Sequence, residues 1–368
     1  MIYLDAAATT LQKPPMVAFA AQAAMRRFAS PGRGGYRPAM LAADALYACR
    51  ELAGDLFSCK PEQVVFTMNA THALNLAIRT LVQSGEQVVI SGFEHNAVTR
   101  PLHYLGAQVV VAGQRLFDPD DTLQAFARSI TPKTRAVICT HVSNVFGYIL
   151  PLEQIAQLCR ERNVPLIVDA SQSAGLLSVR LDALGAAFIC MPGHKALYGP
   201  QGTGILLCGQ TPQPLMQGGS GSASREQDMP AEVPERVEAG TQNVCGICAL
   251  AEGLRFVRQR TPARLLKHEI RLRRLLAAAL QDCPGVRFFQ AEAQTGTLSF
   301  ACEGRDCESI AAQLAEQDMC VRAGLHCAPL AHKTAGTLES GTVRLSPSAF
   351  TTEREAARAA ALLRQLLR

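Results

Sequence analysis

Side chains of catalytic types recur directly after short apolar runs in the first two-thirds of the chain. They are Asn69, Ala70 and Thr71 after "VVFT", His95 after "QVVISGFE", Asn144 after "RAVICTHVS", Asp169 and Gln172 in "PLIVDASQ", and His194 and Lys195 in "FICMPGHK". Taken singly, each of these residues is more often a helix cap or a turn residue than a functional group. Their recurrence at the same point after successive apolar runs instead predicts one shared site.

A lysine in this set suggests chemistry at a carbonyl carbon. Lys195 lies in "MPGHKALYGPQGTG", between glycines and prolines and away from any run of charge. A buried lysine has a lowered pKa, which lets its amine form and exchange an imine. We therefore interpret Lys195 as the lysine that binds the aldehyde of a pyridoxal phosphate cofactor.

The remaining residues match the other needs of that cofactor. Asp169 would keep the pyridine nitrogen protonated, so that the ring can draw electrons from a substrate carbanion. Gln172 would donate to the phenolic oxygen, and His95 would stack on the ring. The phosphate would be held at a helix start, where backbone N–H groups are free, by Asn69, Ala70, Thr71 and His194. Together these residues predict a complete cofactor site.

Nucleotide binding is the competing interpretation of the glycine-rich segments. "GPQGTG" and "QGGSGSAS" contain several glycines, but neither matches the phosphate-binding pattern GxxxxGK[ST], and Lys195 precedes its glycines instead of following them. No GxGxxG follows the first predicted strand. The pattern argues against a nucleotide site.

The apolar runs themselves predict the scaffold. Strands are expected over 63–67, 86–91, 107–112, 135–142, 165–171, 186–191 and 202–208, with helices such as 70–82 and 152–162 between them. Strands that are apolar throughout are typical of sheets covered on both faces, so we expect an α/β fold with a mostly parallel central sheet. Sites in such sheets gather at the carboxyl ends of the strands.

The alternation of predicted strands and helices ends at about residue 209. A loop-rich stretch leads into a long helix after "EAGTQN", and the basic run 258–274 is expected to be one helix with a solvated charged face. The remainder alternates helices with short strands, such as 296–302 and 342–348. This pattern predicts a smaller C-terminal α+β domain.

Composition narrows the class of protein. A net charge of +5 is spread over 368 residues, so no nucleic-acid partner is expected, and no apolar run approaches the ~18 residues of a membrane span. Asp5 lies where a leader peptide would be apolar. Thirteen scattered cysteines indicate free thiols in a reducing cytoplasm, and "CGIC" (245–248) is expected to pack in a helix instead of binding a metal.

Several motifs together resemble the cysteine desulfurase family of class V aminotransferase-type enzymes. They are "YLDAAATT", "FTMNATHALNLAI", "EHNAV", "THVSNVFG", "VDASQSAG", "GHKALYGPQGTGIL" and "EAGTQN". The resemblance covers nearly the whole chain and implies a fold type I pyridoxal phosphate-dependent transferase that forms a homodimer. It implies a large cofactor-binding domain over 15–250, and a small domain of 1–14 and 251–368 that carries the catalytic cysteine. Thr241 would reach the cofactor phosphate of the neighbouring subunit.

Two C-terminal motifs carry the desulfurase resemblance further. "VRAGLHCAPL" implies that Cys327 attacks the sulfur of the substrate, and "GTVRLSPSAF" implies that Arg344 grips its carboxylate through two parallel hydrogen bonds, with Arg322 and Asn144 also near the substrate. Cys327 would otherwise be one more core thiol. Its polar, basic, turn-like neighbourhood of Arg322, Gly324 and His326 instead favours a reactive thiolate.

The implied reaction converts L-cysteine to L-alanine and leaves a persulfide on Cys327. Lys195 would remove the α-proton, and His95 would carry a proton near the substrate sulfur. The chain departs from the family pattern at Pro192, which replaces a serine, and at His72, which replaces an acid. The short loop around Cys327 resembles a subgroup that includes selenocysteine lyases.

Other reactions stay open from the sequence. A selenocysteine lyase would share nearly all of these residues, whereas transamination or β-elimination would not need Cys327. A non-catalytic binding protein is a further alternative, against which the intact lysine, aspartate and cysteine argue. A sulfur-acceptor protein is an expected partner, for iron–sulfur assembly, tRNA thiolation or another cofactor.

Overall fold

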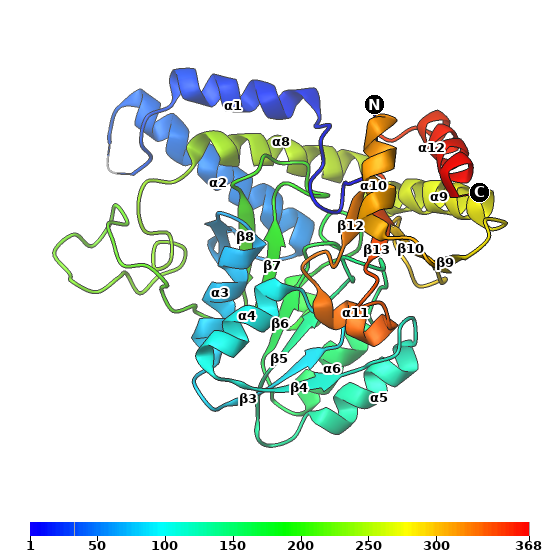
Figure 1. Ribbon diagram of the computed structural model, residues 1–368. Helices are drawn as coiled ribbons and strands as arrows, with labels where there is room; N and C mark the ends of the chain where they lie inside the picture. The colour runs from blue at the N-terminus through cyan, green and yellow to red at the C-terminus, as the bar shows by residue number, and fades with distance from the viewer. Residues whose placement is uncertain (33, 368) are drawn as a thin grey trace.

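The computed structural model describes residues 1–32 and 34–367, and a seven-stranded sheet forms its centre (Figure 1). The strand order is β2-β8-β7-β6-β5-β3-β4. The strands are β2 (Val64–Thr67), β3 (Gln87–Ser91), β4 (Gln108–Ala112), β5 (Thr134–Thr140), β6 (Leu166–Asp169), β7 (Phe188–Pro192) and β8 (Gly204–Cys208). All neighbours run parallel except β8, which is antiparallel to β2 and β7. The predicted mostly parallel sheet is confirmed.

Both faces of this sheet are covered by helices because its strands are apolar on both sides. Val64 packs into one buried cluster and Val65 into the other, as alternate side chains of a strand must. The first cluster includes side chains from α2 (Arg37–Phe57), α5 (Pro119–Ser129), α6 (Leu152–Glu161) and α8 (Val244–Arg260). The second includes α3 (Ala70–Leu81) and α4 (Asn96–Leu105). Helix α1 (Pro15–Arg27) lies outside α8 and α2 (Figure 1).

A second, antiparallel sheet lies in the C-terminal region. Its order is β12-β13-β10-β9, and its strands are β9 (Val286–Phe289), β10 (Leu298–Cys302), β12 (Arg322–Gly324) and β13 (Thr342–Leu345). Helices α9 (Pro262–Leu280), α10 (Cys307–Glu316) and α12 (Glu353–Leu367) pack with this sheet in one buried cluster, whereas α11 (Pro329–Ala335) packs into the first cluster of the central sheet. The predicted α+β character of this region is therefore present.

The first residues of the chain lie in this C-terminal region. β1 (Ile2–Tyr3) pairs in parallel with β11 (Met319–Cys320), and Ile2 and Leu4 belong to the same buried cluster as α12. Residues 2–4 therefore pack with the C-terminal elements, whereas Thr10 and Lys13 bond to the His194 carbonyl. The proposed domain boundary at 250 falls inside α8, which is continuous there.

The single helix expected over 258–274 is wrong. Helix α8 ends at Arg260, α9 begins at Pro262, and Thr261 between them has a φ of 64°. Pro262 has no N–H to continue a helix, and its ring excludes helical geometry at the preceding residue. The same proline is well suited to the first turn of α9.

Three predicted strands also end earlier than expected, and the first of them, expected over 135–142, ends at Thr140. The strand expected over 165–171 ends at Asp169, because the chain turns where Ser173 N–H bonds to the Ala170 carbonyl. The strand expected over 342–348 ends at Leu345, shortly before Pro347, which has no N–H to donate. Within the part of the chain that the structure covers, no helix combines the length and the apolar character needed to cross a bilayer.

Candidate active site

A pocket opens at the carboxyl ends of the central strands and gathers the residues expected from the strand ends. It is lined by Asn69, Ala70, Thr71, His95, Ala97, Thr140, Val142, Asn144, Asp169, Ser171, Gln172, Pro192, His194 and Lys195. Every residue proposed for the cofactor is in this set except Thr241. Parallel strands deliver their carboxyl ends to one edge, which explains the convergence.

Lys195 and Asp169 supply the charged centre of the pocket. Lys195 follows β7, and burial lowers the pKa of its amine to about 8, although the nearby Asp169 carboxylate opposes that shift. Asp169 ends β6 with 2% of its surface exposed, and its Oδ1 accepts a hydrogen bond of 2.9 Å from Ser171 N–H. The amine is therefore neutral in a substantial fraction of molecules near pH 8, as nucleophilic attack requires.

The start of α3 offers donors for an anion. Asn69 caps this helix, its Oδ1 accepting from His72 N–H at 2.9 Å, so Ala70 and Thr71 lie in the first turn, where backbone N–H groups are free. Opposite them, His194 has a buried Nδ1 with no hydrogen-bond partner among the described residues. Pro192 brings neither a hydroxyl nor an N–H to the pocket. The unpaired Nδ1 of His194 fits a ligand oxygen.

His95 is held in one tautomer by its place at the start of α4. Its Nδ1 accepts a hydrogen bond of 3.0 Å from Ala97 N–H, so Nδ1 is unprotonated and the ring proton is on Nε2. Burial is the main reason that the pKa of His95 is lowered, so the ring is neutral. His95 can therefore exchange a proton only at Nε2.

The side-chain amides of Gln172 and Asn144 each donate one hydrogen bond to a backbone carbonyl outside the pocket. Gln172 Nε2 donates to the Ala7 carbonyl at 3.0 Å, and Asn144 Nδ2 donates to the His326 carbonyl at 2.9 Å. Each interaction ties a central strand end to a segment of the C-terminal region. Asn144 thus connects the pocket to the loop of the proposed nucleophile.

Cys327 is exposed, whereas all the other cysteines are buried or half-buried. It follows His326 in a tight turn in which both residues have left-handed backbone geometry, with φ values of 56° and 49°. Its carbonyl accepts a hydrogen bond of 2.8 Å from Asn96 N–H, at the start of α4. The turn holds Cys327 beside the helix that carries His95.

His326 does not add the positive charge expected of it. Its Nε2 contacts the Thr342 carbonyl and hydroxyl at 3.1 Å, and burial is the largest cause that lowers its pKa to about 2. The ring is neutral, so the basic neighbour of Cys327 on this segment is Arg322, whose pKa is raised chiefly by hydrogen bonds to Asp5. The expectation of a basic segment holds for the arginine alone.

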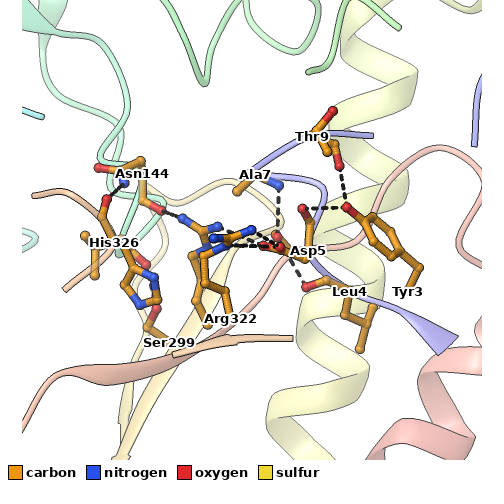
Figure 2. A network of polar contacts seen from close by, with 12 residues as sticks. Tyr3, Leu4, Asp5, Ala7, Thr9, Asn144, Ser299, Arg322 and His326 are labelled. Carbon is orange, nitrogen blue, oxygen red and sulfur yellow. Dashed lines mark hydrogen bonds and ion pairs between the residues drawn. The ribbon is translucent and has the colours of Figure 1, made fainter. Parts of the chain in front are cut away.

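The two arginines proposed for substrate meet at one carboxylate (Figure 2). Asp5 accepts from Arg322 Nη2 at 2.8 Å and from Arg344 Nη2 at 3.0 Å. Arg344 is 2% exposed, and its Nη1 donates to the Asn144 carbonyl at 2.9 Å. Sequence reasoning missed Asp5 in this role, although its place directly after the apolar "IYL" is the signal used for the other strand-end residues.

Thr241 lies outside the pocket of its own chain. It is exposed, on the segment between β8 and α8. Glu238 anchors that segment, pairing with Arg50 at 2.6 Å and accepting from Phe66 N–H at 2.7 Å. The anchored, exposed position is compatible with a contact to a second subunit.

Glu94 is a buried carboxyl group directly before His95. It has no exposed surface, and its Oε1 accepts hydrogen bonds from the Ser91 hydroxyl at 2.6 Å and from Thr140 N–H at 2.7 Å. Burial raises the pKa of Glu94 to about 8, so the group is protonated at neutral pH. Because Thr140 lines the pocket, Glu94 supports its wall from behind.

Replacing Glu94 with glutamine should change how stability depends on pH. Between pH 4.5 and 8 the unfolded wild-type chain loses a proton that the folded protein keeps, so wild-type stability falls as pH rises through this window. Glutamine has no such proton, and its carbonyl can accept both hydrogen bonds. The free energy of unfolding of E94Q relative to wild type should rise by on the order of 4 kcal/mol from pH 5 to pH 8.

Urea unfolding at the two pH values measures this difference. Glu303→Gln, which removes an exposed carboxylate, is the matched control. Its free energy of unfolding relative to wild type should change little between the two pH values. Parallel pH profiles for E94Q and wild type would contradict a protonated buried Glu94.

The "CGIC" segment forms part of the first turn of α8, where Cys245 is half-buried and Cys248 is buried. Over residues 1–32 and 34–367, no group of three or more His, Cys, Asp or Glu side chains is arranged to hold a metal ion. The position of "CGIC" on α8, with Cys248 buried, is that of packing residues.

The chain is similar to known proteins over nearly all of its length. The sequence model of the family described as "Aminotransferase class-V" matches residues 2–358. A "Probable cysteine desulfurase" of Methanothermobacter thermautotrophicus is 31% identical over 96% of this chain and 92% of its own length. Another, of Mycolicibacterium paratuberculosis, is 29% identical over 96% of this chain, which spans only 54% of that protein.

The fold has a similar counterpart among solved structures. The apo structure of a cysteine desulfurase from Thermococcus onnurineus NA1 superposes with a TM-score of 0.91 at 27% identity, covering 100% of this chain and 94% of the other. Agreement over the full length means that both sheets and the helices around them share one arrangement.

Proposed function

The chain belongs to the class V aminotransferase family, and from this premise we propose that it is a pyridoxal phosphate-dependent cysteine desulfurase. The observation that carries the proposal is the pairing of a half-buried lysine, whose amine has a lowered pKa, with an exposed cysteine at one site. Lys195 lies at the base of a strand-end pocket, and Cys327 is held beside the same pocket through Asn96 and Asn144. A transaminase needs the first group but not the second.

The residues present fit pyridoxal phosphate. A half-buried lysine with a pKa near 8, a buried carboxylate, a helix start and the unpaired Nδ1 of His194 form a matching donor set. Lys195 would hold the aldehyde carbon and Asp169 the ring nitrogen, with the phosphate on residues 69–71 and His194, and with His95 and Gln172 at the ring. When bound, the cofactor supplies an electron sink for negative charge at the substrate α-carbon.

The chain's own groups then divide the work. Lys195 takes the α-proton of the amino acid, because its buried amine is a base near neutral pH. His95 exchanges a proton through Nε2. The Cys327 thiolate attacks the substrate sulfur: an S–S bond forms, the substrate C–S bond breaks, and its electron pair stays on carbon, which takes up a proton. Lys195 returns a proton to the α-carbon, so the products are L-alanine and a persulfide on Cys327.

Incubation of the purified protein with L-cysteine tests this proposal. We expect alanine in the supernatant and a Cys327 peptide heavier by one sulfur atom, both measured by mass spectrometry. Pyruvate in place of alanine would indicate β-elimination instead. A parallel incubation with L-selenocysteine compares the two substrates on the same site.

We also propose a homodimer, and α1 supports it. This helix carries no charge from Pro15 to Met25, yet Phe19 and Met25 are 62% and 68% exposed. Tyr36 and Met40, at the start of α2, are also more than half exposed. A second copy of the chain would cover this apolar surface and bring Thr241 of one subunit toward the cofactor phosphate of the other.

Phe19→Asp should therefore convert the dimer to a monomer. A charge at the centre of an apolar interface is buried without a partner, so association should weaken by roughly a hundredfold or more. Light scattering coupled to size-exclusion chromatography measures the mass. Tyr104→Asp, at an exposed aromatic residue on α4, is the matched control and should stay dimeric. An unchanged mass for F19D would place the interface elsewhere.

The cysteines support two further proposals, a cytoplasmic location and a protein that accepts the sulfur of Cys327. All thirteen cysteines are free, which supports a reducing, cytoplasmic setting. The exposed position of Cys327 supports delivery of its sulfur to an acceptor protein, with iron–sulfur assembly as one destination.

A further inference from the structure

We infer that Asp5 is a positioning residue: it holds the guanidinium groups of Arg322 and Arg344 side by side at the cysteine loop and leaves the pair with one net positive charge, matched to a single carboxylate. The inference deepens the proposed function, on which it rests for the identity of the substrate. Its test uses neither substrate nor turnover.

Backbone hydrogen bonds of the residues on both sides of Asp5 fix its position independently of the two arginines. Leu4 N–H bonds to the Cys320 carbonyl at 2.9 Å, and Ala6 N–H bonds to the Ser346 carbonyl at 3.0 Å. Ser346 N–H returns a bond of 2.7 Å to the Leu4 carbonyl. The residues on both sides of Asp5 are thus tied to β11 and to the end of β13, so the carboxylate has a defined position.

The carboxylate divides its two oxygens between the two arginines (Figure 2). Oδ2 accepts from Arg322 Nε at 3.0 Å and Nη2 at 2.8 Å, while Oδ1 accepts from Arg344 Nη2 at 3.0 Å and also lies 3.2 Å from Arg322 Nε. Like-charged guanidinium groups repel one another, and a shared carboxylate removes that penalty. Without Asp5, the half-exposed side chain of Arg322 would be free to turn to solvent.

Arg344 keeps donors for a ligand after these contacts. Its Nε is buried and has no hydrogen-bond partner among the described residues. The same side chain is bound through Nη1 to the Asn144 carbonyl, and Asn144 Nδ2 holds the His326 carbonyl, next to Cys327. One continuous polar chain therefore runs from Asp5 to the nucleophile.

The net charge of the cluster of Asp5, Arg322 and Arg344 indicates which ligands it favours. Two guanidinium groups and one carboxylate sum to +1, and one substrate carboxylate brings the cluster to neutrality. A dicarboxylate would leave a buried excess of negative charge. Asp5 thereby selects a small molecule with a single carboxylate at this end.

Two alkylating agents of similar size and different charge report this electrostatic environment. Iodoacetate carries a carboxylate and iodoacetamide does not, and both react with an exposed cysteine such as Cys327. The ratio of their rate constants cancels changes in the reactivity of the thiol itself. Intact mass spectrometry counts the labels, because unfolding would expose the buried cysteines to additional alkylation.

In Asp5→Asn the ratio of iodoacetate to iodoacetamide rates should rise about three- to fivefold at low ionic strength, and the rise should shrink with added salt. Asp5→Glu should return the ratio toward wild type. Asp182→Asn, which breaks a surface pair with Arg180, should leave it unchanged. An unchanged or lower ratio in D5N, with single labelling, overturns the inference.

Arg322→Gln provides a second test should D5N label at more than one cysteine. Its side chain is half exposed, so the replacement leaves no large cavity. Loss of one positive charge takes the cluster to zero and should lower the ratio about three- to fivefold. A ratio equal to that of wild type overturns the inference as well.

Discussion

Lys195→Ala is expected to abolish covalent attachment of the cofactor and to lower alanine formation from L-cysteine by at least about a thousandfold. Two losses combine, because Lys195 supplies both the amine that holds the cofactor aldehyde and the base that removes the α-proton. The visible absorbance of the bound cofactor should disappear or shift. Alanine is measured by mass spectrometry, and absorbance by a spectrum of the purified protein.

Borohydride reduction followed by peptide mapping identifies the lysine directly. Wild-type protein should carry the reduced cofactor on Lys195, and K195A should carry none. Lys13 is the informative control, because burial lowers its pKa to about 8 as well and its Nζ lies 3.1 Å from the His194 carbonyl. Lys13→Ala should keep the label on Lys195. A label on Lys13 in wild-type protein would refute the assignment.

Cys327→Ala is expected to keep the bound cofactor and its absorbance while losing persulfide formation. Removing a nucleophile that acts as one unit with its base typically removes most of the catalysis, so alanine production should fall by at least about a thousandfold. The site geometry should persist, because the loop is held through backbone carbonyls at 326 and 327 that alanine retains.

The matched control is Cys320→Ala, which removes a half-buried thiol on β11 of the same region. It should keep both absorbance and persulfide on Cys327. Alanine release at the wild-type rate from C327A would exclude Cys327 as the nucleophile, and transamination or β-elimination would then have to account for the product.

Much of the scaffold was predictable because it depends on local patterns. Apolar runs with polar residues at their ends predicted the strands of the central sheet and the side of the sheet on which the pocket lies. The break at Thr261 was not predicted, although Pro262, directly after it, is a local signal for it. The antiparallel direction of β8 was not, because it depends on pairing with β7 and β2 at a distance.

The residues of the site likewise divide into those that local sequence patterns predicted and those that depend on the packed fold. Residues directly after strands, such as Asp169 and Lys195, were found because the sheet alone brings them together. Asp5 was missed because its partners are 317 and 339 residues away in the chain. The protonation of Glu94 and the neutrality of His326 depend on burial, which becomes known only when the whole fold is packed.

The parallel pairing of β1 with β11 has a consequence for biosynthesis. The N-terminal residues leave the ribosome first, but their partners are among the last to be made, so Asp5 waits through almost all of translation before it meets either arginine. The central sheet can assemble while synthesis continues, whereas the contacts of Asp5 with Arg344 form only once residue 344 has been made. The cluster of Asp5 with its two arginines is therefore among the later parts of the structure to form during synthesis.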